Sequence, residues 1–323
     1  MIGYYVHHVG LGHLRRAQAL ASVWDRPVTG LSTLPRPDDW PGEWVRLPAD
    51  DGGSVVNATA HGQLHWAPVG HPGHRERMAA ISAWIADAAP DALVVDVSME
   101  VLQLARLHGV RTVGVVLPGH RGDVAHLRGL TLADALVGFW PDHIRTPVEG
   151  VPEDLAARIR PLGALSGLTG TDAAADARAV TVLLGAGGHG VGPADLAAAQ
   201  AQTPEWSWTV LAPGIGDWVA DPAPVLSRAA VVVTHAGEGA LADVATARRP
   251  AVVLPQERPH DEQWATARAL THAGLPVAVL GQWPDHGWAA LLDRVAALPG
   301  ADWKRWCDGE AATRFAALVR EIC

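Results

Sequence analysis

The sequence is poor in lysine, and its basic residues are outnumbered. Among 323 residues there are 25 basic and 34 acidic side chains, and Lys304 is the single lysine. The net charge of -9 argues against nucleic acid as a partner and against strong binding to an anionic membrane. We therefore expect no nucleic acid among its partners. The dominance of arginine, alanine and glycine is typical of a GC-rich bacterial genome.

Cysteine and long apolar runs are also scarce. Cys307 and Cys323, the two cysteines, lie near the end of the chain and offer no disulfide framework. No apolar run has the length of a membrane span, and the first residues do not have the pattern of a signal peptide. Hydrophobic residues make up 49% and charged residues 18%, which indicates a globular protein with room for two domains. We expect a cytoplasmic enzyme without a transmembrane segment.

The most informative stretch is residues 231–267. Residues 231–234 predict a buried strand, which runs into a glycine-rich turn at 235–239 and then an alanine-rich helix. Glycines let the backbone approach a ligand, and a helix N-terminus directs N–H groups at an anion. The pattern therefore favours a diphosphate, with Asp243 within reach of a ribose and Gln263 within reach of sugar hydroxyls.

This stretch resembles the nucleotide-sugar site of the GT-B glycosyltransferases, in the branch of the lipid II N-acetylglucosaminyltransferase and the antibiotic glycosyltransferases. The matching positions are His235, Gly237, Gly239, Pro250, Pro255, Glu262, Gln263 and Ala267. Three positions depart from the pattern: Asp243 replaces the usual Glu, Ala240 a frequent Ser or Thr, and Arg249 a Gly. The resemblance implies an inverting transfer that needs no divalent metal or other cofactor. A UDP-sugar is the expected donor, and the departures leave dTDP- and GDP-sugars open.

The start of the chain has a similar sequence pattern of a strand, a glycine-containing turn and a helix. Residues 2–9 predict a strand, residues 10–13 a tight turn and residues 14–24 a helix, which is half of a doubly wound unit. The motif G-x-G-H-x-x-R at residues 10–16 resembles the first loop of the same families, where the histidine faces the cleft. A second strand and glycine turn occur at residues 179–190. The expected fold is α/β, with two Rossmann-like domains facing a cleft.

Four segments are expected. Residues 1–163 would form an acceptor-side domain, and residues 164–175, rich in small residues, would form a linker. Residues 176–300 would form the nucleotide-sugar domain. The resemblance implies that the last helical segment, residues 301–323, packs back on the N-terminal domain.

Sugar transfer needs a base for the acceptor hydroxyl and stabilisation of the leaving diphosphate. His13 is the candidate base, with Asp96, at the end of the strand 93–96, as its orienting partner or as the base itself. Asp96 could alternatively cap the helix 99–108, although Ser98 is better placed for that. The candidate donor-binding residues are Gly12, Gly187, Gly188, Val219, His235, Gly237, Glu238, Gly239, Ala240, Asp243, Glu262 and Gln263.

Residues 49–75 form a long histidine-rich stretch that we interpret as an acceptor-binding loop. The candidates are His65 and His71, with His120 from a later loop. His61 and His65 have a spacing that would suit a metal on a helix, but Pro68, glycines and the lack of a carboxylate or cysteine argue against it. A solvated loop is the plain alternative. We expect the acceptor to be a small molecule or a lipid-linked one.

Two other functions fit parts of the pattern. The G-x-G-H-x-x-R loop also resembles UDP-sugar hydrolases of the pseudaminic acid pathway, which direct water at the sugar diphosphate. A non-catalytic activator of a glycosyltransferase is the second alternative. The intact set of His13, His235, Asp243 and Gln263 argues against the activator, and the block at residues 235–263 favours a transferase over a hydrolase.

Overall fold

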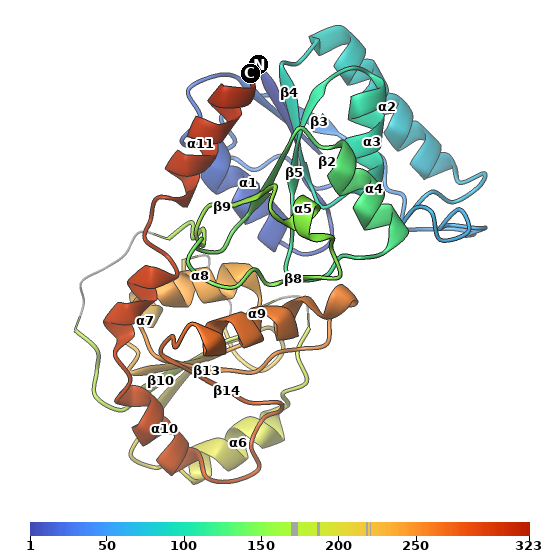
Figure 1. Ribbon diagram of the computed structural model, residues 1–323. Helices are drawn as coiled ribbons and strands as arrows, with labels where there is room; N and C mark the ends of the chain where they lie inside the picture. Colours follow the sequence, from blue (N-terminus) through green and yellow to red (C-terminus); the bar gives the residue numbers. More distant parts are fainter. Residues whose placement is uncertain (169–173, 186–187, 218, 220) are drawn as a thin grey trace. The chain divides into compact units, whose positions relative to one another are not determined.

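The computed structural model describes residues 1–168, 174–185, 188–217, 219 and 221–323 (Figure 1). The chain divides into two compact units. Unit 1 comprises Met1–Gly138, Val148–Leu162 and Ala312–Cys323, and unit 2 comprises Phe139–Pro147 and Gly163–Ala311. Each unit is built around its own parallel sheet, which is the two-domain α/β fold that the sequence predicted.

The unit boundaries differ in detail from the expected segments. The 3-10 helix η2 (Gly300–Arg305) stays in unit 2, where Trp303 Nε1 donates to the Arg249 carbonyl at 2.7 Å. Only Ala312–Cys323 returns to unit 1. Of the expected linker, residues 169–173 lie outside the described residues.

Unit 1 has a seven-stranded parallel sheet. Its order is β3 (Trp44–Arg46), β2 (Val28–Ser32), β1 (Ile2–Tyr5), β4 (Ala92–Asp96), β5 (Arg111–Val115), β7 (Ala135–Gly138) and β9 (Ile159–Pro161). All residues of β1, β2 and β4 are buried, as expected for parallel strands covered on both faces. Two further short strands, β6 (Gly119–His120) and β8 (Val148–Glu149), pair separately.

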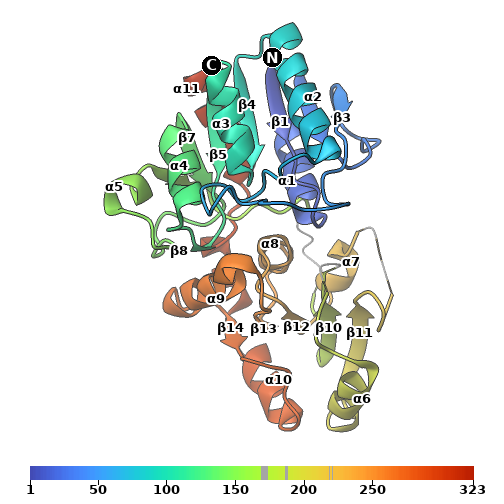
Figure 2. The ribbon, with the colours of Figure 1, turned by 90° about the vertical axis from the view of Figure 1, so that its right-hand side faces the viewer.

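Helices cover both faces of this sheet. In Figures 1 and 2, α1 (Gly12–Ala21) and α11 (Ala311–Ile322) lie on one side, and α2 (Pro72–Ala88), α3 (Met99–Leu107) and α4 (Val124–Leu132) on the other. A short helix, α5 (Glu153–Ala156), precedes β9. The Ser98 side chain accepts from the Val101 N–H at the start of α3, which confirms the expected cap. Asp96 is therefore not needed for that task.

Unit 2 has a five-stranded parallel sheet. Its order is β11 (Ser207–Leu211), β10 (Ala179–Leu183), β12 (Val231–Thr234), β13 (Ala251–Val253) and β14 (Val277–Val279). One face carries α8 (Glu238–Thr246) and α9 (Glu262–His272), and the other carries α6 (Pro193–Ala201) and α10 (Trp288–Ala296) (Figures 1 and 2). Two short helices, α7 (Ala223–Leu226) and η1 (Pro259–Asp261), lie in connections.

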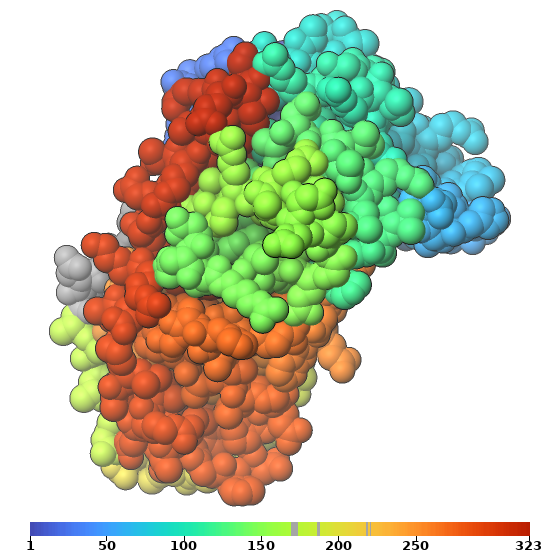
Figure 3. Space-filling view, in the orientation of Figure 1, coloured from blue at the N-terminus to red at the C-terminus, as the bar shows by residue number. Residues whose placement is uncertain are grey.

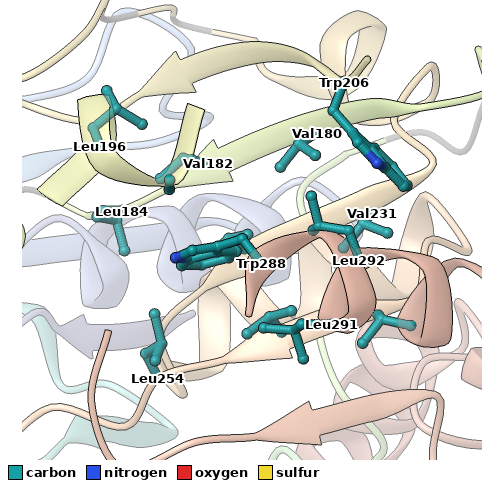
Figure 4. Close-up of a cluster of buried hydrophobic side chains, with 14 of the residues drawn as sticks. Val180, Val182, Leu184, Leu196, Trp206, Val231, Leu254, Trp288, Leu291 and Leu292 are labelled. Atoms are coloured by element: carbon teal, nitrogen blue, oxygen red, sulfur yellow. The ribbon is translucent and has the colours of Figure 1, made fainter. Parts of the chain in front are cut away.

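Trp288 of α10 fills the core of unit 2. Its side chain is 0% exposed and lies among aliphatic residues of β10, β12 and its own helix (Figure 4). Its indole N–H donates to the Pro284 carbonyl at 2.9 Å, so the polar atom is satisfied inside an apolar cluster. This packing fixes α10 on one face of the sheet, and α8 and α9 cover the opposite face.

The strand order locates the expected ligand regions. In an open parallel sheet, a crevice forms beyond the carboxyl ends of the two strands at which the strand order reverses. In unit 1 these are β1 and β4, and in unit 2 they are β10 and β12. Candidate residues from the sequence analysis lie in the loops after β1, β10 and β12. The last residue of β4 is the candidate Asp96.

The histidine-rich stretch after β3 forms turns rather than a helix over residues 49–71, and much of it lies at the surface of unit 1 (light blue in Figure 3). Its His61 ring contacts the Asn57 side chain at 3.3 Å. Across the parts of the chain that the structure describes, we find no helix that combines enough length and apolar character to cross a membrane.

Candidate functional site

In unit 1, the end of β4 and the start of α1 bring His13 and Asp96 together. His13 Nδ1 lies 3.0 Å from Asp96 Oδ1. The His13 side chain is 18% exposed and Asp96 is 0% exposed, so one partner reaches solvent and the other is fully buried. Val97, the next residue, has a φ of 83°, a left-handed conformation that is unusual for a β-branched residue. Strain of this kind clusters at functional sites.

Arg16 also holds the Asp96 carboxylate. Arg16 Nη1 lies 2.9 Å from Oδ1 and 3.1 Å from Oδ2, and the Tyr4 hydroxyl donates to Oδ2 at 3.5 Å. Burial alone would raise the pKa of Asp96, but Arg16 and His13 outweigh it and the pKa falls to about 2. Asp96 is thus ionised near neutral pH.

This ionisation state decides the tautomer of His13. A carboxylate only accepts hydrogen bonds, so the proton between the two groups belongs to His13 Nδ1. In the neutral ring, Nε2 then carries the lone pair. The pair is therefore arranged so that His13 Nε2 can accept a proton from a bound hydroxyl.

Two more histidines follow β1 beside His13. The His7 ring stacks on His8 at 5.1 Å and meets His13 edge-on at 5.5 Å. Burial, with smaller effects from His13 and His8, lowers the pKa of His7 to about 4. His7 therefore stays neutral near pH 7 and adds no charge next to His13. The sequence analysis did not single out either residue.

In unit 2, the turn between β12 and α8 forms around His235. His235 Nδ1 accepts from the Gly237 N–H at 2.9 Å. Burial, helped by Arg258 and His189, lowers the pKa of His235 to about 4, so the ring is neutral and its Nε2 carries a proton. No partner for Nε2 occurs among the described residues. His235 Nε2 is thus a neutral hydrogen-bond donor for a ligand.

Glycines surround this ring. A Cβ at Gly237 would come within 2.4 Å of His235 Cε1, and one at Gly185 within 3.0 Å of Nε2. Helix α8 starts at Glu238 without a side-chain cap from Gly237. The backbone N–H groups of its first turn, which includes Gly239 and Ala240, are therefore suited to an anion.

Gln263, the second residue of α9, joins two loops at this edge. Its Oε1 accepts from the Ala236 N–H at 3.1 Å and from the Gln256 N–H at 2.9 Å, and the residue is 4% exposed. Because the oxygen is used twice by backbone, only the amide NH2 can serve a ligand. Gln263 can therefore donate to a sugar hydroxyl but is not placed to accept from one.

Arg258 adds a charge that the sequence analysis missed. Its Nη2 donates to the Gly188 carbonyl at 2.9 Å and to Gln256 Oε1 at 2.8 Å. Gly188 has a φ of 88°, which suits glycine. The guanidinium links the loops after β10 and β13 and acts electrostatically on His235. An arginine within the proline-bounded loop at residues 255–259 was the available signal in the sequence.

Asp243 lies further along α8 and is 8% exposed. Its Oδ1 accepts a hydrogen bond from the Ser166 hydroxyl at 2.7 Å. Ser166 belongs to the expected linker, and no sequence pattern indicated that it contacts Asp243, the residue expected to bind the ribose.

The other candidate donor residues lie at the starts of helices or in loops. Glu238 and Glu262 begin α8 and α9, respectively. Gly12 begins α1, Val219 lies half-buried after β11, and Gly187 is outside the described residues.

The three candidate acceptor histidines occupy different settings in unit 1. His65 Nε2 lies 3.0 Å from Asp123 Oδ1, and its ring meets His126 at 4.2 Å. His71 is 6% exposed and caps α2, where its Nδ1 accepts from the His74 N–H at 3.1 Å and its Nε2 contacts the Gly52 carbonyl. His120 is exposed on β6. Because both nitrogens of His71 serve the backbone, we assign it to the architecture of the loop.

Comparisons with known proteins find a family match for part of unit 2 and solved structures of similar fold for the chain. Residues 189–282 match the model of the glycosyltransferase family 28 C-terminal domain. A sequence comparison with curated proteins finds no match. Three solved structures align over 99% of this chain: the glycotransferase of kitacinnamycin (TM-score 0.70, 16% identity, 98% of its chain), MurG of Acinetobacter baumannii (0.65, 15%, 99%) and LpCGTa in complex with UDP (0.64, 16%, 98%).

These likenesses show the fold, and the family model identifies the domain that carries His235, Asp243 and Gln263. The chain is therefore a GT-B fold protein with a glycosyltransferase family 28 C-terminal domain, an enzyme domain of the glycosyltransferase class.

Proposed function

We propose that this protein transfers a sugar from a nucleoside-diphosphate sugar, a UDP-sugar in the first instance, to a hydroxyl of an acceptor, with inversion at the anomeric carbon. The observation that carries the proposal is the His13–Asp96 pair, in which a buried carboxylate holds a half-buried imidazole by Nδ1. An arrangement of this kind orients the ring and stabilises the imidazolium that forms when Nε2 takes a proton.

The donor would bind unit 2. Its diphosphate would meet the first turn of α8 and the Nε2–H of His235, with the positive charge of Arg258 nearby. These groups provide charge stabilisation without requiring a metal ion. Asp243 would bind the ribose and the Gln263 amide a sugar hydroxyl. Gly188 and Val219 would line the same region from neighbouring loops.

In the proposed reaction, a hydroxyl of the acceptor reacts with the donor sugar. The acceptor oxygen attacks the anomeric carbon and forms the new C–O bond while its proton passes to His13 Nε2. The bond from the anomeric carbon to the diphosphate oxygen breaks, and its electron pair leaves with the diphosphate. Attack from the face opposite the leaving group inverts the configuration.

Two features support the choice of donor and acceptor regions. UDP is the ligand named for one of the aligned structures, and the segment that matches the family 28 domain, residues 189–282, includes His235, Asp243 and Gln263. For the acceptor, a small molecule or a lipid-linked one, we propose the loop at residues 49–71 with His65, together with His120. The contact of His65 Nε2 with the Asp123 carboxylate would orient and polarise the imidazole that a ligand meets.

His13→Ala tests the proposal. We expect turnover with a UDP-sugar and an accepted hydroxyl compound to fall by roughly 10²–10⁴-fold. Affinity for UDP should change by less than about twofold, because unit 2 would bind the nucleotide. His272→Ala, an exposed residue of α9, is the control.

Near-normal transfer by His13→Ala would exclude His13 as the base. Release of free sugar by the wild type, with no acceptor able to compete with water, would favour a sugar-nucleotide hydrolase over a transferase. A complete lack of sugar-nucleotide binding and turnover would favour the alternative that the protein is a non-catalytic activator of a glycosyltransferase.

A further inference from the structure

Arg16 makes the His13–Asp96 pair a three-membered charge system. One nitrogen, Nη1, contacts both oxygens of Asp96 at 2.9 and 3.1 Å, and the carboxylate has no exposure to solvent. The Arg16 side chain is 10% exposed. The charges of Asp96 and Arg16 therefore face each other where little water screens them.

The charge balance has a chemical consequence for His13. A buried carboxylate that interacted with His13 alone would favour the imidazolium, so the ring would lose its proton only at a higher pH. The positive charge of Arg16 opposes that attraction, while the hydrogen bond between Asp96 and His13 Nδ1 stays in place. We propose that Arg16 is a positioning residue that balances the charge of Asp96 and so extends the pH range in which His13 Nε2 is free to act as a base. This inference rests on the proposed role of His13.

Other titratable and charged groups also face this system. The pKa of Tyr4, on β1, is raised well above 10 by burial and by Asp96, so its hydroxyl stays protonated. Burial lowers the pKa of His7 to about 4 and lowers that of His8 as well. Arg77 of α2 acts on both histidines and contributes to the lowering of their pKa values. Because His8 has an ordinary pKa inside the same range, the resonance of the His13 ring itself has to be followed.

Three variants separate charge from packing. Arg16→Gln keeps a hydrogen-bond donor without the charge, and Arg16→Lys keeps the charge on a different geometry. Arg15→Gln removes the same charge from the exposed neighbouring position of α1 and is the matched control. The first measurement is the proton NMR titration of the His13 imidazole, which does not depend on activity. The second is the pH profile of kcat/KM for transfer.

In Arg16→Gln, we expect the titration midpoint of His13 and the acid limb of the profile to move to higher pH by about 1 unit. Arg16→Lys should shift both less, and Arg15→Gln should leave both within about 0.2 units of the wild type. UDP affinity should be unchanged in all three variants. If Arg16→Gln does not fold, the comparison of Arg16→Lys with Arg15→Gln decides the matter.

An unshifted His13 titration in Arg16→Gln, or the same shift in Arg15→Gln, would overturn the assignment of Arg16. That result is distinct from a failure of the proposed function, which would appear as normal transfer by His13→Ala. A shifted titration without any change in the rate profile would also overturn the inference, because it would separate Arg16 from the proton transfer.

Discussion

At the level of single residues, Asp243 has a partner that the sequence pattern does not include. Ser166, distant in sequence, donates its hydroxyl to Asp243 Oδ1 at 2.7 Å within unit 2. The serine fixes the direction of a carboxylate that is 8% exposed. A ribose hydroxyl that binds Asp243 therefore meets an oriented acceptor.

Asp243→Asn should weaken the binding of UDP by roughly 1–3 kcal/mol, because the change removes the charge and replaces an accepting oxygen by an NH2 group. Isothermal titration calorimetry measures the loss. Ser166→Ala, which leaves the carboxylate in place, should cost about 1 kcal/mol or less. Asp293→Asn, at an exposed position of α10, is the control for charge alone. Unchanged affinity of Asp243→Asn for UDP would remove Asp243 from the donor site.

At the level of elements, the β12–α8 turn depends on two glycines for different reasons. Gly237 touches the His235 ring so closely that a Cβ would lie 2.7 Å from Nδ1 and 2.4 Å from Cε1. Gly239 has nothing within 4 Å of the corresponding position and is the second residue of α8. The first glycine is required by packing and the second is open to a ligand.

Gly237→Ala should destabilise the free protein by about 1–3 kcal/mol, because the histidine or the backbone has to move. Gly239→Ala should leave stability unchanged or raise it by up to about 1 kcal/mol, since alanine favours the helix. Thermal denaturation without ligand compares the two. Equal melting temperatures for both variants would contradict the packing argument at Gly237.

At the level of the whole molecule, three histidines are kept neutral by burial. The pKa values of His7, His126 and His235 each fall to about 4, in every case with burial as the largest cause. For His126, which is 3% exposed, Asp123 opposes the effect of burial without overcoming it. Both units therefore carry histidines that resist protonation in the folded state.

Stability should consequently fall as the pH drops from about 7 to 4. Between the unfolded pKa of about 6.5 and the folded value of about 4, the unfolded chain binds protons that the folded chain does not, so acid favours unfolding. Each of the three lowered pKa values adds to this loss of stability, in proportion to the difference between its unfolded and folded values. Asp96 has its pKa lowered to about 2, so its contribution is lost only below about pH 4, outside this window.

Melting temperatures at pH 7.5 and 5.0, recorded at one scan rate, test this expectation. The wild type should melt at a clearly lower temperature at pH 5.0, and His126→Gln should show a smaller difference between the two conditions. A melting temperature that does not change between pH 7.5 and 5.0 would mean that these histidines are not kept neutral by the fold.

Sequence patterns were enough to predict the two parallel α/β units and the strand ends at which we propose that ligands bind. Short apolar runs followed by glycine turns suffice for this, because period and turn chemistry are local properties. The pattern at residues 235–263 also indicated the family of the second unit before any contact was known. Helix boundaries shifted by a few residues, as at α1, which was expected at residues 14–24 and spans Gly12–Ala21.

The tertiary structure alone decided which side chains share an atom. Arg16 and Asp96 are 80 positions apart, and Ser166 and Asp243 are 77 apart, so no local pattern links them. It also assigned the Gln263 oxygen to backbone and His71 to a helix cap, which changed what each can offer a ligand. Hydrogen bonds and burial depend on distances between segments that meet only when the sheets form, and these set the protonation states on which the proposed chemistry rests.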